Sequence, residues 1–389
     1  MQLEQVRPGI IRPKLAAIDS SLLASWAKDA LSSMQEPKAR AIGSLEAFFE
    51  KNWIPVICWH HFDELIRYPE MQVVANRIAF LKSLPQVAWI SSSMGSNDLG
   101  SIVDLFDAEV KEIVIAKDIE RGDLVSSVRE HLVRYGTPAQ ITTLDDWEEL
   151  RPLLMANRAR QQEVASIVHV ENRSDDKVRI VSLNKAKPKD RASRERFIKR
   201  YAVDIEQDLK LRGDRRLRDS AGTARKFTSS IAENIEEMCA RNVSPLEAFA
   251  TQFDVPMSDI SNETTLAEFK QIARRRRLLR GTSSRLGLEL EAIWPTLRYA
   301  KIPSEIIQAQ IRRARKSVPR TSGSDLGDDY LTCLAPYVDA IVVDKRTHEF
   351  LNQCTRRDPV FSGMVGFFTR AATYESLPQA LAPLAPIEG

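Results

Sequence analysis

The sequence contains few of the residues that mark disulfide-rich, zinc-binding or membrane proteins. Its 389 residues include no Cys-x-x-Cys pair and no Cys/His cluster at zinc-site spacing. No stretch approaches the roughly 20 apolar residues that span a bilayer, and the amino-terminal segment lacks the apolar run of a signal peptide. We therefore expect a soluble, cytoplasmic protein with no membrane partner and four reduced cysteines: Cys58, Cys239, Cys333 and Cys354.

Two common classes of enzyme also lack support in the sequence. It has no GxxxxGK[S/T] phosphate loop, no GxGxxG placed after a strand and no GxSxG motif. A nucleotide-hydrolysing motor and a serine hydrolase are therefore not indicated. The charge is nearly balanced, with 56 Lys and Arg against 53 Asp and Glu, so net charge alone does not point to nucleic acid. A hydrophobic content of 43% allows one large domain or two of ordinary size.

Short apolar runs alternate with helical patterns at both ends of the chain. Such alternation is typical of crossovers in a mainly parallel α/β sheet flanked by helices. The expected strands are 15–18, 54–59, 87–90, 111–116 and 340–343. The expected helices that follow or separate them are 22–26, 38–51, 60–66, 71–84, 328–337 and 346–356.

The middle of the chain has a different character. From about 145 to 318 it is mostly helical and polar, apart from a possible strand pair at 164–170 and 177–183. A core assembled from both chain ends, with a helical insertion between them, is the simplest architecture. It has three parts, an α/β core, a mostly helical basic insertion and a loose proline-rich tail: 12–115 with 320–370, 116–319, and 371–389.

Acidic side chains stand at the ends of the expected elements. Asp19 directly follows the first strand, Glu64 lies about one helical turn past the second, and Asp344 follows the last. Asp328 or Asp329 opens the helix before that last strand. Each acid alone is equally typical of a helix cap or a turn. Because ligands of such sheets bind at the carboxyl ends of the strands, their recurrence there favours a site for Mg²⁺ or Mn²⁺.

This order of acids resembles the PIN-like ribonucleases, in particular stand-alone proteins of bacteria and phage. The most specific tract is PYVD (336–339), followed four residues later by DKR (344–346). The resemblance covers about 12–115 and 320–358. It implies a PIN-like sheet and an Mg²⁺- or Mn²⁺-dependent endoribonuclease of toxin or defence type. The implied ligands are carboxylates, with the third position open among three aspartates: Asp19, Glu64, one of Asp325, Asp328 and Asp329, and Asp344. Asp339 is expected to have a structural or supporting role.

Four basic clusters suit the phosphates of an RNA substrate: 185–200, 212–226, 274–280 and 312–320. The third is the strongest, because four consecutive arginines face all around a helix and few carboxylates flank them. The residues expected to contact nucleic acid are Arg274, Arg275, Arg276, Arg277, Lys345 and Arg346. A solvated helix face laced with ion pairs, or a surface for an inhibitor or other partner protein, remains an alternative.

Three histidines lie close to the acidic positions. His60 and His61 precede Glu64, and His348 follows Asp344 by four residues. A histidine beside a buried strand is more typically a hydrogen-bonded structural residue than a catalytic one. Two other functions stay open beside the ribonuclease. One is a non-catalytic α/β module that binds nucleic acid or a partner protein, and the other is a structure-specific DNA nuclease.

Overall fold

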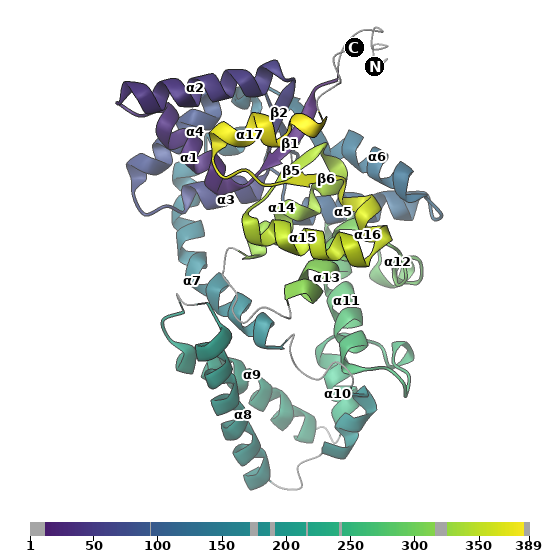
Figure 1. Cartoon of the computed structure of the whole chain (residues 1–389). Coiled ribbons are helices and arrows are strands. Elements are labelled where there is room, and N and C mark those ends of the chain that lie inside the picture. The colour runs from purple at the N-terminus through teal and green to yellow at the C-terminus, as the bar shows by residue number, and fades with distance from the viewer. Residues whose placement is uncertain are drawn as a thin grey trace.

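The protein has an α/β core from which a group of helices extends (Figure 1). The computed structural model describes residues 12–93, 95–171, 178–186, 191–214, 217–240, 243–315 and 325–384. Six strands form one sheet: β1 (Lys14–Ile18), β2 (Trp53–Ile57), β3 (Val87–Ile90), β4 (Val133–Gly136), β5 (Ala340–Val342) and β6 (Phe367–Thr369). Their order is β4-β3-β2-β1-β5-β6, and all neighbours are parallel except the β3–β4 pair. The expected α/β class is therefore confirmed, but the sheet is mixed.

Seventeen α-helices lie within the described residues. Those of the first half are α1 (Ser20–Ala30), α2 (Gln35–Glu50), α3 (Trp59–Ile66), α4 (Met71–Ser83), α5 (Ile102–Ile115), α6 (Arg121–Leu132), α7 (Trp147–Glu171) and α8 (Arg191–Arg212). Those of the second half are α9 (Ser220–Ala240), α10 (Pro245–Gln252), α11 (Leu266–Leu286), α12 (Leu290–Leu297), α13 (Pro303–Arg315), α14 (Asp325–Cys333), α15 (Lys345–Arg357), α16 (Pro359–Val365) and α17 (Leu377–Ala380). None of these helices has both the length and the apolarity that crossing a membrane requires.

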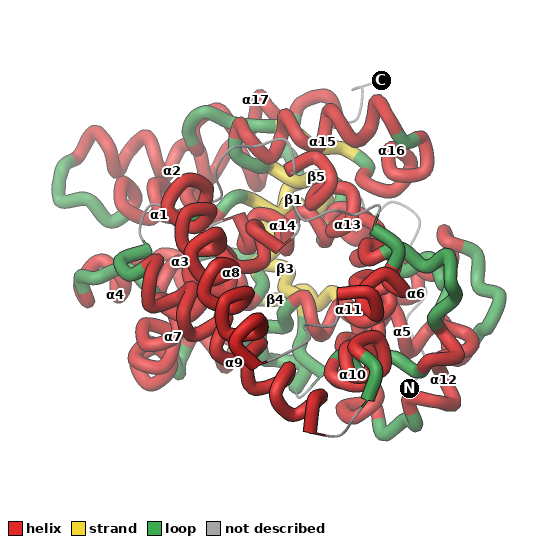
Figure 2. Tube along the Cα trace, turned by 90° about the horizontal axis from the view of Figure 1, so that it is seen from below, coloured by secondary structure: helices red, strands yellow, loops and turns green. Residues whose placement is uncertain are grey.

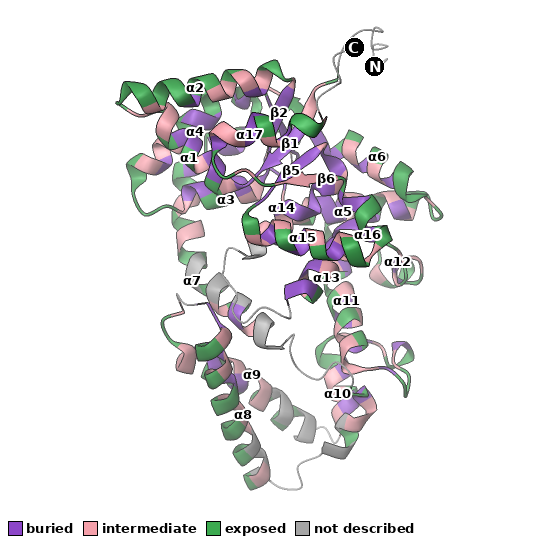
Figure 3. Ribbon diagram, viewed as in Figure 1, coloured by how far each residue is buried: buried purple, intermediate pink, exposed green. Residues whose placement is uncertain are grey.

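Helices cover both faces of the sheet, as Figure 2 shows from below. Successive side chains of a strand point to opposite faces. In β1, Leu15 and Ala17 join an apolar cluster with α5, α6 and α11 to α16. Ala16 and Ile18 join a second cluster with α1 to α4. Figure 3 shows this buried layer in the upper part of the molecule, above the more exposed α8 and α9.

The described side chains of the extending helices α8 to α10 join two small apolar clusters. One contains Ile205, Leu209 and Ala224, and in the other Leu246 and Ala250 of α10 pack with Phe269 of α11. These helices connect to the core through α7 and α11 (Figure 1).

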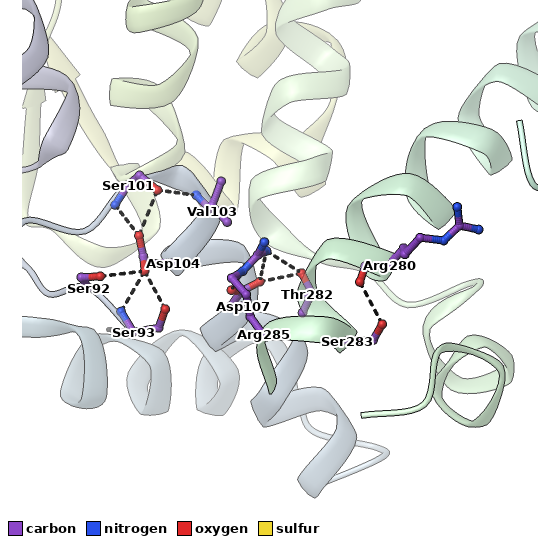
Figure 4. Close-up of polar contacts among 10 residues, drawn as sticks. All are labelled: Ser92, Ser93, Ser101, Val103, Asp104, Asp107, Arg280, Thr282, Ser283 and Arg285. Atoms are coloured by element: carbon purple, nitrogen blue, oxygen red, sulfur yellow. Dashed lines mark hydrogen bonds and ion pairs between the residues drawn. The ribbon is translucent and has the colours of Figure 1, made fainter. Parts of the chain in front are cut away.

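A buried carboxylate attaches α11 to α5. Asp107 is 2% exposed and accepts hydrogen bonds from the Thr282 hydroxyl at 2.5 Å and from Arg285 Nη2 at 2.8 Å (Figure 4). One turn earlier on α5, Asp104 accepts from the backbone N–H of Ser101 at 2.7 Å and of Ser93 at 2.8 Å (Figure 4). These contacts fix the start of α5 and the end of α11 relative to the sheet.

Several expectations for individual segments are wrong. The run 111–116 ends helix α5, because Val110 and Ile113 continue its buried helical stripe. The expected strand at 164–170 belongs to α7, and most of the described part of its partner is a short 3-10 helix that begins at Ile180. The segment that contains α6 and β4 was assigned to the insertion, yet β4 pairs with β3 in the sheet.

The carboxyl-terminal segment is packed rather than loose as far as residue 384. Tyr374 is 2% exposed and stacks on Trp26, with ring centroids 5.7 Å apart. Its hydroxyl donates a hydrogen bond to Asp29 at 2.8 Å. Leu377 and Leu381 are fully buried against the same face of the sheet. Residues 385–389 lie outside the described part.

Candidate functional site

The acidic positions meet where the chain changes direction across the sheet. From β1 the chain continues to β2 on one side, while β5 returns to the other side of β1. In open α/β sheets, ligands bind at the carboxyl ends of the strands at such a point. Asp19 follows β1, and its backbone N–H donates to Val342 O at the end of β5 at 2.8 Å. Asp344 follows the same end of β5, so both acids lie at one edge.

Asp19 and Asp344 each cap a helix with one carboxylate oxygen. Asp19 Oδ1 accepts from the Ser21 N–H at 2.8 Å at the start of α1. Asp344 Oδ1 accepts from the Thr347 N–H at 2.7 Å at the start of α15. No described residue donates a hydrogen bond to either Oδ2 atom. The two acids therefore each cap a helix, and the capping bonds leave Oδ2 of each without a hydrogen bond from a described residue.

Glu64 reaches the site from α3 and lies against α14. A Cβ placed on Gly327 would be 2.3 Å from Glu64 Oε1, so the carboxylate rests on the bare glycine backbone. The Ser20 hydroxyl makes a hydrogen bond with the same carboxyl group. Although Glu64 as a whole is exposed, burial of its carboxyl end raises its pKa, and the charge of Asp19 raises it further.

Replacing Gly327 with alanine should disturb the acidic site without destabilising the fold. Alanine favours a helix over glycine by about 1 kcal/mol, and the flexible Glu64 side chain can move away. We expect unchanged or higher thermal stability, together with at least about tenfold weaker Mn²⁺ binding measured by calorimetry, because a displaced ligand costs roughly 1.4 kcal/mol or more. Gly43→Ala in α2, where nothing lies within 4 Å of the added Cβ, is the matched control. Equal Mn²⁺ affinities for both variants would mean that Glu64 is not a ligand of the ion.

Asp328 is the centre of the acidic group. It lies in α14, one residue after Gly327, and is half-buried. Burial, and then the charges of Asp344, Asp19 and Glu64, raise the pKa of Asp328 to about 8, while Arg315 opposes the rise. Burial is the largest cause of the rise, and the contributions of the three carboxylates show that they lie close to Asp328. Of the acids predicted as ligands, Asp19, Glu64 and Asp344 therefore lie near Asp328.

The donors of this group fit a hydrated divalent cation. They are all carboxylate oxygens, which Mg²⁺ and Mn²⁺ prefer, and a cation would offset the repulsion that, together with burial, disfavours the ionised form of Asp328. Across the described ranges, no three His, Cys, Asp or Glu side chains are gathered closely enough to hold an ion directly. Mg²⁺ usually keeps several of its waters, so a wider ring of carboxylates suits it better than a closed cage.

Asp329 does not belong to the acidic group, contrary to its prediction as a metal ligand. It is 7% exposed and forms an ion pair with Arg315 Nη1 at 2.9 Å. Consecutive residues of a helix point about 100° apart, so Asp328 and Asp329 face different neighbours. The side chain of Asp325, the other rival, lies outside the described part.

The histidines next to Glu64 support the site rather than enter it. His61 is 1% exposed, its Nε2 contacts the backbone oxygen of Ile18 at 2.8 Å, and its Nδ1 accepts from the Cys58 N–H at 3.1 Å. It thereby joins the ends of β1 and β2. His60 stacks on Tyr330 with ring centroids 4.2 Å apart, and burial lowers its pKa to about 3. His60 is therefore neutral at physiological pH.

Asp339 has the structural role expected for it. It accepts from Arg129 Nη1 at 3.1 Å and Nη2 at 3.0 Å, and from the Leu15 N–H at 2.7 Å. Leu15 is near the start of β1, so this ion pair lies at the edge of the sheet opposite to the acidic group. His348 likewise makes local contacts, since Asn352 Nδ2 lies 3.1 Å from its Nδ1.

The arginines of α11 divide into two kinds. Arg276 is 2% exposed and pairs with Glu291 and with Asp259, the latter at 3.9 Å. Arg275 pairs with Glu305 at 2.6 Å. The prediction that Arg276 contacts nucleic acid is therefore wrong, because carboxylates distant in sequence bury it. Arg274 and Arg277 remain exposed.

Other basic positions have mixed outcomes. Lys345 is exposed and Arg346 lies over the Phe350 ring, at the start of α15. In the 212–226 cluster, Arg212 pairs with Asp208 at 2.7 Å and Lys226 with Glu163 at 3.5 Å, as on a solvated face. Much of the 185–200 and 312–320 clusters lies outside the described residues or side chains.

Sequence reasoning did not identify the residues that position the acids. Ser20 and Gly327 contact Glu64. Arg315 forms an ion pair with Asp329, and its positive charge also opposes the rise in the pKa of Asp328. A glycine inside a helix next to a suspected ligand was the available signal for Gly327, since it often marks a close approach.

Comparison of the chain with family models, with curated proteins and with solved structures finds no match.

Proposed function

We propose that the protein is a metal-dependent nuclease of PIN-like type that hydrolyses phosphodiester bonds, with RNA as its substrate. The observation that supports this most is the convergence of four carboxylates at the carboxyl edge of the sheet, marked by the raised pKa of Asp328. Such a surplus of negative charge destabilises a protein unless a cation balances it. A bound divalent cation would supply that balance.

In this proposal Asp19, Glu64, Asp328 and Asp344 hold Mg²⁺ or Mn²⁺. When bound, the ion lowers the pKa of a water and neutralises charge on the phosphodiester. The hydrogen bonds from the Ser21 and Thr347 N–H groups hold Asp19 and Asp344 in one orientation, and Oδ2 of each would bind the ion. Half-burial of Asp328 limits the water around the group and strengthens its interaction with a cation.

Asp344→Asn tests the proposal directly. The amide oxygen can still accept from the Thr347 N–H, so the cap remains while the charge is lost. With purified protein, Mn²⁺ and a mixed pool of single-stranded RNA, we expect cleavage that EDTA abolishes and that this variant lowers by at least about 1,000-fold, roughly 4 kcal/mol of barrier. Glu349→Gln, an exposed carboxylate on the same helix, should cleave at the wild-type rate.

Offering single-stranded RNA, single-stranded DNA and branched DNA side by side separates the alternatives. Cleavage confined to branched DNA would replace the ribonuclease with a structure-specific DNA nuclease. Salt-sensitive binding of RNA without cleavage in Mg²⁺ or Mn²⁺ would favour a non-catalytic module. Cleavage that survives both EDTA and Asp344→Asn would overturn the metal-dependent mechanism.

A further inference from the structure

Among the described residues, two arginines beside the acidic group have no hydrogen bond or ion pair to a carboxylate. Arg274 Nη2 from α11 and Arg312 Nη1 from α13 both donate to Oε1 of Gln308, at 3.4 and 3.0 Å. Two guanidinium groups thus share one neutral acceptor. In the part of the chain that the structure describes, neither arginine forms an ion pair with a carboxylate. An Arg side chain has five N–H donors, so most of theirs remain available.

The carboxylates nearest to this pair are engaged by other arginines. Glu305 pairs with Arg275 at 2.6 Å, and Asp329 pairs with Arg315 at 2.9 Å. Among the described arginines of this region, the positive charges of Arg274 and Arg312 are therefore the ones that no carboxylate pairs with directly. Burial, and then the charge of Arg274, lower the pKa of Arg312 to about 10, as expected for like charges held together. Holding them together costs free energy that a bound anion would recover.

The arginine pair lies next to the acidic group along α14. Both arginines interact electrostatically with Asp329 and Tyr330, the two residues that follow Asp328. Tyr330 stacks on His60, which is one turn before Glu64 on α3. Tyr330 and His60 are half-buried. The surface thus passes from carboxylates to an aromatic pair and then to two guanidinium groups.

We propose that Arg274 and Arg312 form a subsite that binds a phosphodiester of the nucleic-acid strand next to the one held at the carboxylates. This inference rests on the proposed function, because it takes the carboxylates as the place of cleavage. Guanidinium groups bind phosphate oxygens in pairs of hydrogen bonds, whereas a lysine supplies only a point charge. The phosphates of a nucleic-acid strand that binds beside four carboxylates are repelled by them, and the two guanidinium groups would offset this repulsion. A base of the strand can stack on the aromatic pair Tyr330 and His60.

Binding in EDTA isolates the subsite from catalysis. A fluorescein-labelled single-stranded RNA is titrated with wild type, Arg274→Gln, and the double variant R274Q/R312Q, by anisotropy at several salt concentrations. We expect the double variant to raise Kd at least about tenfold and to reduce the slope of log K against log salt by about 0.7 for each phosphate that the variant no longer neutralises. Arg313→Gln, the adjacent exposed arginine on α13, should raise Kd less than about twofold, as a non-contacting surface charge.

Thermal melts of each variant check folding, and Arg274→Gln alone serves if the double variant is unstable, since Arg274 is exposed. A double variant that binds like Arg313→Gln overturns the subsite, as does wild type that binds no RNA. Loss of binding in the double variant without any wild-type cleavage in Mn²⁺ supports the subsite and rejects the nuclease. Mn²⁺-dependent cleavage with KM unchanged in the double variant supports the nuclease and rejects the subsite.

Discussion

Asp328→Asn is expected to abolish Mn²⁺-dependent cleavage and, in EDTA, to make the protein more stable. The carboxylate of Asp328 is disfavoured by burial and by the charges of Asp344 and Asp19, whereas a neutral amide of the same size is not. In EDTA at pH 8 we expect a gain of about 5 kcal/mol in the free energy of unfolding, measured by urea titration. Mn²⁺ should stabilise the wild type and leave this variant nearly unchanged.

The pH dependence of this gain follows from the pKa of Asp328. It is about 8 in the folded protein against a usual value of 3.8, so the folded state keeps a proton that the unfolded state has lost. Wild-type stability is therefore reduced progressively as pH rises from about 4 to 8, while the asparagine variant lacks this loss. The gain should shrink toward pH 4. Mn²⁺ must displace the same proton, so its apparent affinity should rise between pH 6 and 8.

Asp329→Asn is the matched comparison, because the neighbouring acid is expected to respond in the opposite direction. Asp329 and Arg315 form a buried ion pair, and removing one charge leaves the other without full compensation. We expect a loss of about 3 kcal/mol with no dependence on Mn²⁺. Equal effects of the two substitutions would mean that the acids are not divided between a cation site and an ion pair.

The acidic group was predictable from the sequence because its strands are short apolar runs in the centre of the sheet. β1, β2 and β5 are fully or almost fully buried, so an acid at their ends stands out. The edge strands β4 and β6 gave no such signal. β4 reads Val-Arg-Tyr-Gly with two exposed residues, and β6 has only three residues, all half-buried. Their pairing depends on the strands beside them rather than on local pattern.

The choice between Asp328 and Asp329 could not be made from the sequence. Their directions depend on the phase of α14, and a shift of one residue turns a side chain by about 100°. The same limit applied to the arginines of α11. Their carboxylate partners, Glu291 and Glu305, come from α12 and α13, so local charge counting treated Arg275 and Arg276 as unpaired. Tertiary contacts, which no local pattern encodes, decided both cases.

A buried glutamate holds the inserted helix α13 against the core. Glu109 on α5 is fully buried, and its Oε1 accepts from the Ser304 N–H at 3.0 Å and from the Tyr337 hydroxyl at 2.6 Å. Its Oε2 accepts from the Ser304 hydroxyl. Burial raises the pKa of Glu109 to about 7, although these hydrogen bonds oppose the rise. The group therefore joins three elements and titrates near neutral pH.

Glu109→Ala is expected to cost about 3–4 kcal/mol of stability, because it leaves a cavity and buried donors on Ser304 and Tyr337 without an acceptor. Glu109→Gln is the control, since its amide oxygen can replace Oε1 and its NH₂ can donate to the Ser304 hydroxyl. The folded pKa of about 7 exceeds the usual 4.5, so wild-type stability falls as pH rises through that range, and the glutamine variant avoids this loss. Urea unfolding from pH 4.5 to 8 should show the advantage of Glu109→Gln growing to about 3 kcal/mol. A difference that stays constant over this range would mean that Glu109 is ionised throughout, and that the contact between α5 and α13 is held by charge rather than by a neutral carboxyl group.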